Sequence, residues 1–152
     1  MIRKLNKTEF HQAVAVALEV YLQCGQDDFD DEGLEAFKSF IFNDERMNEL
    51  RIYGAFEENR LVGIMGTKNK GKHISLFFIN KDFHRKGIGK QLFDYSQYDC
   101  PANEITVNSS TYAIKFYESL GFEKTDDRQQ CQHKHDPSTF HRHIPKIHPS
   151  LL

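Results

Sequence analysis

The sequence has no tryptophan, few prolines and only three cysteines in 152 residues. The cysteines, at positions 24, 100 and 131, are odd in number and widely spaced, which does not suit a disulfide framework. Long apolar runs are also missing. The N-terminus lacks the apolar stretch of a signal peptide, and "ISLFFI" is far too short to cross a bilayer. We therefore expect a cytoplasmic protein with reduced thiols and no association with membranes.

Excess positive charge is absent as well. The formal net charge is -2, so no electrostatic case exists for nucleic acid as a partner. The hydrophobic fraction of 39% and the charged fraction of 28% are ordinary for a globular protein. A chain of this length fits one domain and buries roughly 70% of its unfolded surface, so a real core is expected.

Helical spacing dominates the first part of the chain after a short strand at residues 2–5. Asn6 and Glu9 predict a capping box, and the helix should end at about Cys24 because Gly25 follows. A second helix, capped by Asp30 or Asp31, follows an acidic segment. Its apolar face consists of Leu34, Phe37, Phe40 and Ile41.

From residue 50 the apolar period changes to two. Strands are predicted at residues 50–58, 60–69 and 73–80, and the third is so continuously apolar that we expect it to be buried on both faces. A helix with Ile88, Leu92 and Tyr95 on one side, a strand at 104–108 and a helix ending at Gly121 complete the pattern. The predicted fold class is α/β: a single domain with a mixed, mostly antiparallel sheet and helices on both faces.

The composition changes beyond residue 125. Residues 126–152 carry three of the four prolines and five of the eight histidines, with weak periodicity, and we interpret them as a partly flexible tail after a domain at 1–125. Two His-x-His pairs and Cys131 in this tail follow no structural zinc pattern. No metal site is predicted.

The glycine loop "HRKGIG", residues 84–89, indicates a site for an anion, because glycines let a backbone approach a ligand and the first amides of a helix lack internal partners. A dinucleotide fingerprint needs a third glycine, which is missing. "GTKNKGKH", starting at Gly66, comes near a nucleotide-triphosphate loop, but His73 replaces the hydroxyl residue and strands flank it. We interpret it as a hairpin turn.

Two segments resemble the Gcn5-related N-acetyltransferase (GNAT) superfamily. "HRKGIG" after an apolar strand is similar to the family's pyrophosphate motif of Gln or Arg, two residues, Gly, one residue, Gly or Ala, with His84 as a departure at the first position. "VNSSTYAIKFYESLGF", residues 107–122, resembles a later strand and helix of the family. The resemblance covers residues 1 to about 125, and "STFHRHI" is the candidate for the family's last strand.

The resemblance implies an acetyl-CoA site and a GNAT-like fold. Main-chain groups of Phe78 and Ile79 would pair with the pantetheine arm, because the neighbouring strand splays away. The glycine loop would hold the pyrophosphate, and Asn108 and Ser110 would approach the pantetheine. The loop residues concerned are His84, Arg85, Lys86, Gly87, Ile88, Gly89 and Lys90.

Tyr117 would be the catalytic proton donor to the departing thiolate. Each of these side chains also has a structural interpretation: Tyr117 as a core aromatic, Ser110 as a helix cap, and Asn108 as a turn former at the strand end. Lys86 and Lys90 could be a solvated helix start, although positive charge there opposes the helix dipole and favours an anionic ligand.

The predicted reaction is transfer of an acetyl group to a primary amine of a small molecule or peptide by direct attack, without a covalent intermediate on Cys100. No carboxylate occurs in residues 74–80, so a water relay or an acid from elsewhere must take the amine proton. The acidic segment with Asp27, Asp28 and Glu32 is either an attraction for a cationic acceptor or a solvated loop with a helix cap. The alternative function is a non-catalytic acyl-CoA-binding regulatory module. Exposed strand edges would allow a homodimer.

Overall fold

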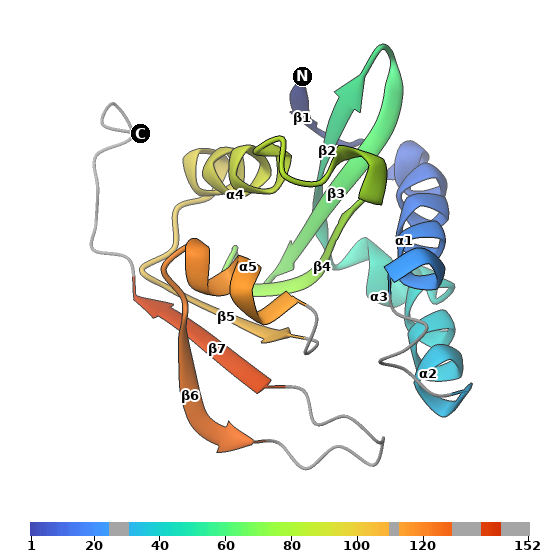
Figure 1. Ribbon diagram of the computed structural model, residues 1–152. Coiled ribbons are helices and arrows are strands. Elements are labelled where there is room, and N and C mark those ends of the chain that lie inside the picture. Colours follow the sequence, from blue (N-terminus) through green and yellow to red (C-terminus); the bar gives the residue numbers. More distant parts are fainter. Residues whose placement is uncertain (25–30, 110–112, 129–137, 144–152) are drawn as a thin grey trace.

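The computed structural model describes residues 1–24, 31–109, 113–128 and 138–143, and within them the strands form a seven-stranded sheet (Figure 1). The strands are β1 (Ile2–Lys4), β2 (Arg51–Glu57), β3 (Arg60–Lys68), β4 (His73–Ile79), β5 (Glu104–Ser109), β6 (Glu123–Arg128) and β7 (Ser138–His143). The α-helices are α1 (Phe10–Cys24), α2 (Asp31–Ile41), α3 (Asp44–Asn48), α4 (Ile88–Asp99) and α5 (Ile114–Ser119). Short 3-10 turns, η1 (Lys7–Glu9) and η2 (Lys81–Phe83), precede α1 and follow β4.

The strand order is β1-β2-β3-β4-β5-β7-β6, and every adjacent pair except β4 and β5 is antiparallel. Helices α1, α2 and α3 lie on one face of the sheet, and α4 and α5 lie on the other (Figure 1). The predicted fold class, a mixed and mostly antiparallel sheet covered on both faces, is confirmed.

Two apolar clusters lie on the two faces, and β4 contributes to both. Ile74, Phe77 and Ile79 pack into the cluster under α4 and α5, whereas Leu76 and Phe78 pack into the cluster under α1 and α2. The apolar run is thus explained by two-faced packing, as expected. The second half of the strand is nevertheless only partly buried, because β5 has already turned away from it.

The ends of three elements follow the predicted local chemistry. Gly121 has φ 90°, and the amides of Gly121 and Phe122 donate to the carbonyls of Glu118 and Tyr117, which is a Schellman C-cap. The turn between β3 and β4 has positive φ at Asn69, Lys70 and Gly71, so the near miss to a nucleotide loop is the hairpin that was predicted. Asp31 is the first helical residue of α2, and Asp30 lies outside the described residues.

The sheet continues past residue 125. Strand β6 spans that position, and β7 falls within the "STFHRHI" segment, where it pairs with β5 along six residues. The short helix α3 was missed by the periodicity, although Asn43 caps it by accepting from the Arg46 amide at 3.0 Å. None of the helices in the described ranges combines the length and apolar character needed to cross a membrane.

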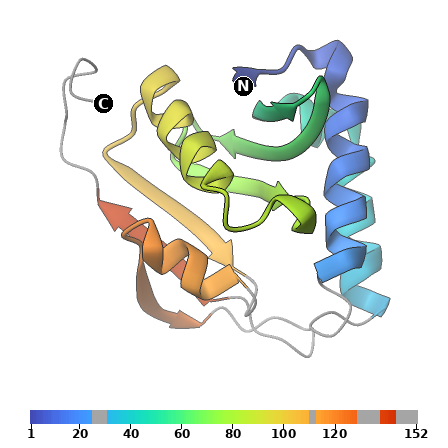
Figure 2. The ribbon, with the colours of Figure 1, turned by 45° about the horizontal axis from the view of Figure 1, so that its top comes forward.

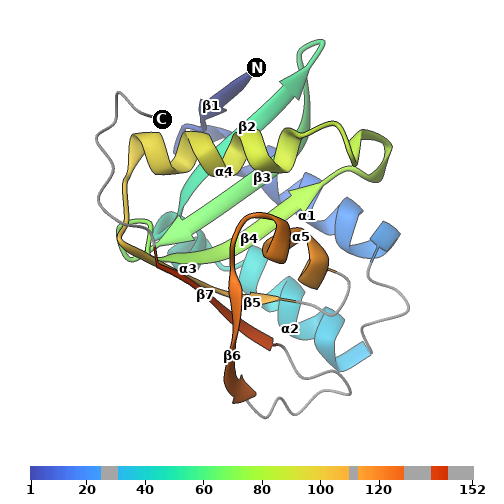
Figure 3. The same cartoon turned by 60° about the vertical axis from the view of Figure 1, so that its left-hand side comes forward.

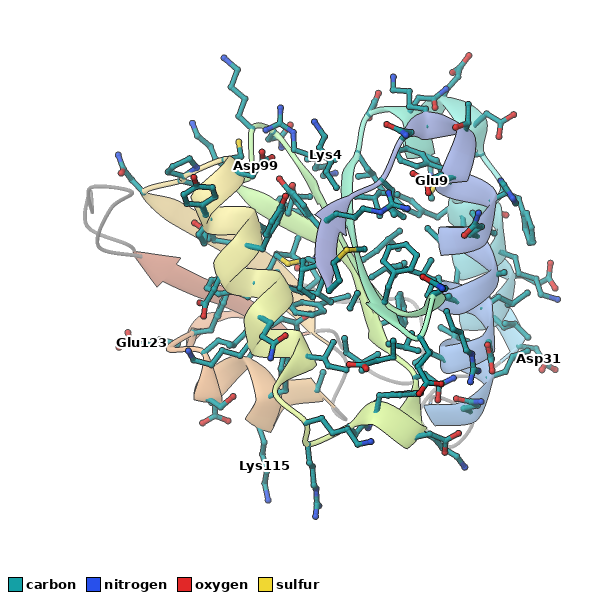
Figure 4. The ribbon with its side chains drawn as sticks, turned by 90° about the horizontal axis from the view of Figure 1, so that it is seen from above. Lys4, Glu9, Asp31, Asp99, Lys115 and Glu123 are labelled. Atoms are coloured by element: carbon teal, nitrogen blue, oxygen red, sulfur yellow. The ribbon has the colours of Figure 1, made fainter. Side chains whose placement is uncertain are left out.

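Helix α4 is anchored to the sheet at its far end. Tyr53, fully buried on β2, donates its hydroxyl to Asp99 Oδ2 at 2.8 Å, and Arg51 lies 3.7 Å from the same oxygen. Figure 4 labels Asp99 at this end of the helix. These contacts hold this end of the helix on β2, and the glycine loop lies at its opposite end.

A bidentate ion pair ties β1 to the start of α1. Arg3 donates to both carboxylate oxygens of Glu9 at 2.9 and 2.7 Å, and its guanidinium lies 4.6 Å from the centre of the Phe56 ring. Glu9 also accepts from the Asn6 amide at 2.9 Å, as the predicted capping box requires. The hydrogen bond from Arg3, with that from Asn6, lowers the pKa of Glu9 to about 2.

We predict that this ion pair makes stability depend on acid pH. Because the folded pKa of Glu9 lies below its unfolded value of about 4.3, its stabilisation is present above that value and is lost as the pH falls towards about 2. The difference in melting temperature between wild type and Glu9→Gln should be constant above pH ~6 and shrink below pH ~5. Glu49→Gln, an exposed charge loss, is the control; a pH-independent difference for Glu9→Gln would contradict the prediction.

Candidate functional site

The open edge of β4 is the first component of the site. Strands β4 and β5 pair in parallel only at His73–Thr106 and Ile74–Val107, and beyond these pairs they diverge (Figure 2). On the other side, the Asn80 amide donates to the Val62 carbonyl at 2.8 Å. Residues 62 and 80 are therefore a hydrogen-bonded pair of the antiparallel ladder with β3, and such pairs alternate with pairs that make no ladder bonds.

The register decides which groups of β4 face the gap. By this alternation Phe78 directs its main chain towards Ile64 of β3, while the N–H and C=O groups of Phe77 and Ile79 point towards the side that β5 has left. The sequence analysis assigned this role to Phe78 and Ile79. The structure keeps Ile79 on the open edge and places Phe77, not Phe78, beside it.

The glycine loop is the second component, and it follows β4 after the short η2 turn. The loop enters α4 through a left-handed turn, with Arg85 at φ 64° and Gly87 at φ 77°. Gly87 is the N-cap and has no side chain to offer, and the first helical hydrogen bond runs from the Gln91 amide to the Gly87 carbonyl. By helix geometry, the amides of Ile88, Gly89 and Lys90 therefore have no acceptor within the helix.

The two glycines of the loop serve different purposes. A Cβ on Gly87 would meet nothing within 4 Å, so Gly87 is needed for its backbone conformation beside open space. A Cβ on Gly89 would lie 2.6 Å from the ring of Phe116 on α5. Gly89 is buried, so its small size lets α5 pack against α4, a packing role that the motif alone did not suggest.

His84 turns back from the loop onto the strand. Its Nε2 lies 2.7 Å from the carbonyl oxygen of Ile79, and the ring is half-buried. Because a carbonyl oxygen can only accept, Nε2 must carry the hydrogen. The residue that departs from the family motif therefore contacts the open edge of β4.

The basic side chains of the loop are exposed. Lys86 places its ammonium 5.1 Å from the centre of the Phe83 ring, and Lys90 forms an exposed ion pair with Asp94 at 3.1 Å. Such exposed pairs hold their partners weakly. Helix α4 has no acidic residue in its first turn, so its N-terminus presents main-chain dipoles and positive charge together.

Tyr117 lies in an aromatic cluster that connects α5 to β4. Its ring centre is 6.0 Å from that of Phe77, 5.4 Å from Phe116 and 5.5 Å from Phe122. Its side chain is buried, and this burial raises the pKa of its hydroxyl above the ordinary value. The packing is that of a core aromatic, yet the cluster includes Phe77, whose main chain lines the open edge.

The remaining predicted residues lie across the gap or outside the description. Asn108 is exposed on β5, one residue beyond the last pair with β4. Ser110, Asp27 and Asp28 lie outside the described residues, as do Cys131 and the first His-x-His pair. Asp31 and Glu32 are exposed in the first turn of α2 (Figure 4).

Phe77 and Phe116 are the site residues that sequence reasoning missed. Both lie in apolar runs, where a core position and a position beside a site look alike. The parity of the β4 ladder could have identified Phe77, but that parity depends on a bulge between β3 and β4 that the sequence does not reveal. The motif spacing gave no sign that Phe116 meets Gly89.

A family model identifies the family of the chain. A family model described as "Acetyltransferase (GNAT) domain" matches residues 26–135. A search of the curated proteins gave no match.

Solved structures show a similar fold. A GCN5-related N-acetyltransferase from Rhodopseudomonas palustris has a TM-score of 0.80 at 18% identity, with 95% of each chain covered. The PaiA N-acetyltransferase from Thermoplasma acidophilum, solved in complex with coenzyme A, has a TM-score of 0.73 at 18% identity and coverage of 95% and 98%. An aminoglycoside 6'-N-acetyltransferase complexed with coenzyme A has a TM-score of 0.64 at 13% identity and coverage of 97% and 99%.

We predict that the two loop glycines respond differently to alanine. Gly89→Ala should destabilise the protein by about 1–3 kcal/mol, because the Phe116 ring is held by Phe77 at a centre distance of 5.0 Å and has little room to move. Gly87→Ala should cost about 1 kcal/mol through its positive φ alone.

Chemical denaturation of single and double variants with Phe116→Leu measures the difference. The free energy of unfolding lost in the double variant Gly89→Ala with Phe116→Leu should be smaller than the sum of the two single losses, by about 0.5 kcal/mol or more. The losses for Gly87→Ala and Phe116→Leu should add. Additivity for both pairs would show that Gly89 does not make room for Phe116.

Proposed function

The chain belongs to the GNAT acetyltransferase family, and from that premise we propose that it transfers an acetyl group from acetyl-CoA to a primary amine by direct attack. The observation that carries the proposal is the adjacency of two main-chain surfaces: the N-terminus of α4, whose first amides have no helical acceptor, and the edge of β4 from which β5 diverges. Residues 80–87, which include η2 and the start of the glycine loop, join them. Figure 3 shows α4 crossing the sheet beside β4, with α5 below it.

The N-terminus of α4 is proposed to hold the pyrophosphate. Amides of Ile88, Gly89 and Lys90 would donate to phosphate oxygens, and each hydrogen bond to a charged group is worth about 1.5–3 kcal/mol. The exposed Arg85 and Lys86 would add attraction that salt screens. The coenzyme A complexes of PaiA and of the aminoglycoside acetyltransferase, which share the fold, support a CoA-type donor.

The open edge of β4 is proposed to hold the pantetheine arm. Two amide groups of an extended arm can pair with a strand edge as an added strand does. The groups on offer are the N–H and C=O of Phe77 and the N–H of Ile79. Asn108 would approach the arm from β5, where it is the first residue beyond the last pair with β4. Such pairing would draw the thioester into the gap beside the cluster that contains Tyr117.

Tyr117 is proposed to donate a hydrogen bond or proton to the departing thiolate. Burial raises its pKa, so the hydroxyl stays protonated at neutral pH. A thiol has a pKa of about 8.5, below that of this tyrosine, so complete proton transfer is uphill. Stabilising the developing charge is what the hydroxyl can do, which puts the expected benefit near the lower end of about 10²–10⁴-fold.

The amine must lose a proton before it attacks. An alkyl amine with a pKa near 10.4 is deprotonated at pH 7 at a cost of roughly 4.6 kcal/mol. Glu19 on α1 reaches the end of β4, where its Oε1 accepts from the side-chain Nδ2 of the buried Asn80 at 3.5 Å. We propose that Glu19 accepts the proton through water.

Asp31 and Glu32 would attract a cationic acceptor, and the neighbour that is an aminoglycoside acetyltransferase shows that this fold can serve amines.

Tyr117→Phe should lower kcat by about 10²-fold and leave KM for acetyl-CoA nearly unchanged, because the hydroxyl acts on charge that forms in the transition state. CoA release over a panel of primary amines measures both constants. Cys100→Ala is the control: Cys100 lies at the end of α4 distant from the loop by about 18 Å, so direct attack predicts full activity. Acetyl-CoA binding without turnover on any amine would favour the regulatory module.

Glu19→Gln should lower kcat/KM at neutral pH, and the defect should shrink as the pH approaches about 10, where the amine is already neutral. The exposed Glu35→Gln on α2 removes the same charge elsewhere. A defect that stays constant from neutral to alkaline pH would show that Glu19 does not assist deprotonation.

A further inference from the structure

His84 makes a specific contact between the glycine loop and the strand that precedes it. The Nε2–H donates to the Ile79 carbonyl at 2.7 Å, and the bond closes a ring that contains the whole of η2. This hydrogen-bonded segment, residues 79–84, is further held by Asn80, which is buried. The side-chain oxygen of Asn80 accepts from the Asp82 main-chain amide at 3.0 Å. The conformation at residues 79–84 is therefore held from both ends.

The contact changes what the open edge of β4 can offer. The register places the Ile79 carbonyl among the groups facing the gap, and His84 already uses this acceptor. An extended ligand would then find the Ile79 amide and both main-chain groups of Phe77. The imidazole thereby sets where along the edge such a ligand begins to pair.

The contact also bears on the loop. Arg85 follows His84 and holds φ 64°, a conformation that is uncommon for a residue with a side chain. A residue in that conformation needs its neighbours to hold it there. The bond from His84 supplies such a constraint immediately before the strained position, and Gly87 and the α4 amides follow two residues later.

We propose that His84 is a positioning residue: its Nε2–H bond to Ile79 locks the glycine loop onto β4, so that the helix amides and the strand edge are aligned before acetyl-CoA arrives. This inference rests on the proposed donor site. In this proposal the His84 side chain bonds to β4 and does not contact the phosphates. A glutamine can offer an N–H from a side chain of similar reach and should replace the histidine, whereas alanine cannot.

Steady-state kinetics of His84→Ala and His84→Gln test the proposal. Losing one preorganising hydrogen bond should raise KM for acetyl-CoA about five- to tenfold with kcat within about twofold, and His84→Gln should stay within about threefold of wild type. His11→Ala is the matched control, because His11 also bonds a nearby carbonyl, that of Thr8 at 2.9 Å, but on α1 away from the loop. An unchanged KM in His84→Ala, or no rescue by glutamine, would overturn the proposal.

The position of the hydrogen on the His84 imidazole can be measured independently of enzymatic activity. A long-range ¹H–¹⁵N NMR spectrum of the ligand-free protein at about pH 8, where an ordinary imidazole is neutral, should show the hydrogen of His84 on Nε2. A hydrogen on Nδ1 would overturn the contact. If the wild type bound no acetyl-CoA, the donor site would be wrong, whereas a hydrogen on Nδ1 would show separately that the contact of His84 with Ile79 does not form.

Discussion

The divergence of β4 from β5 is the constraint on which the rest of the site depends. The main-chain groups of a strand inside a sheet normally form hydrogen bonds with both neighbouring strands, but β4 pairs with β5 at only two residue pairs. From Phe77 to Ile79 one side of the strand is left to another partner. The chain then passes through η2 and the glycine loop into α4, whose first amides also have no helical acceptor. The two surfaces are therefore joined by only eight residues, 80–87.

The packing around these surfaces explains why they keep their positions. Helix α4 is anchored at one end by Tyr53 and Asp99 and is pressed against α5 at the other, where Gly89 makes room for Phe116. Phe116 and Tyr117 in turn meet Phe77 on the strand. One aromatic cluster thus connects the helix that would bind the pyrophosphate, the strand that would bind the pantetheine, and the proposed proton donor.

Much of the fold followed from local sequence chemistry. Apolar periodicity located α1, α2, α4 and the strands β1 to β5 to within a few residues, but it did not identify β6. Gly121 predicted its helix end because only a left-handed residue forms that cap. Side-chain partners did not follow from it. The parity that puts Phe77 on the open edge depends on a bulge between β3 and β4 that the sequence does not reveal. The contact of Gly89 with Phe116 joins residues 27 positions apart in sequence. The contact of His84 with Ile79 depends on the η2 turn, and a turn of three residues produces no periodic pattern in the sequence.

The most direct test of the account is a map of backbone amides by NMR as acetyl-CoA is added. The account predicts that the amides of Ile88, Gly89 and Lys90 shift together with those of Phe77 and Ile79, and that these five exchange more slowly with solvent once the ligand is bound. Shifts confined to the Asn69–Lys72 turn, or an unperturbed α4 N-terminus under saturating ligand, would contradict it.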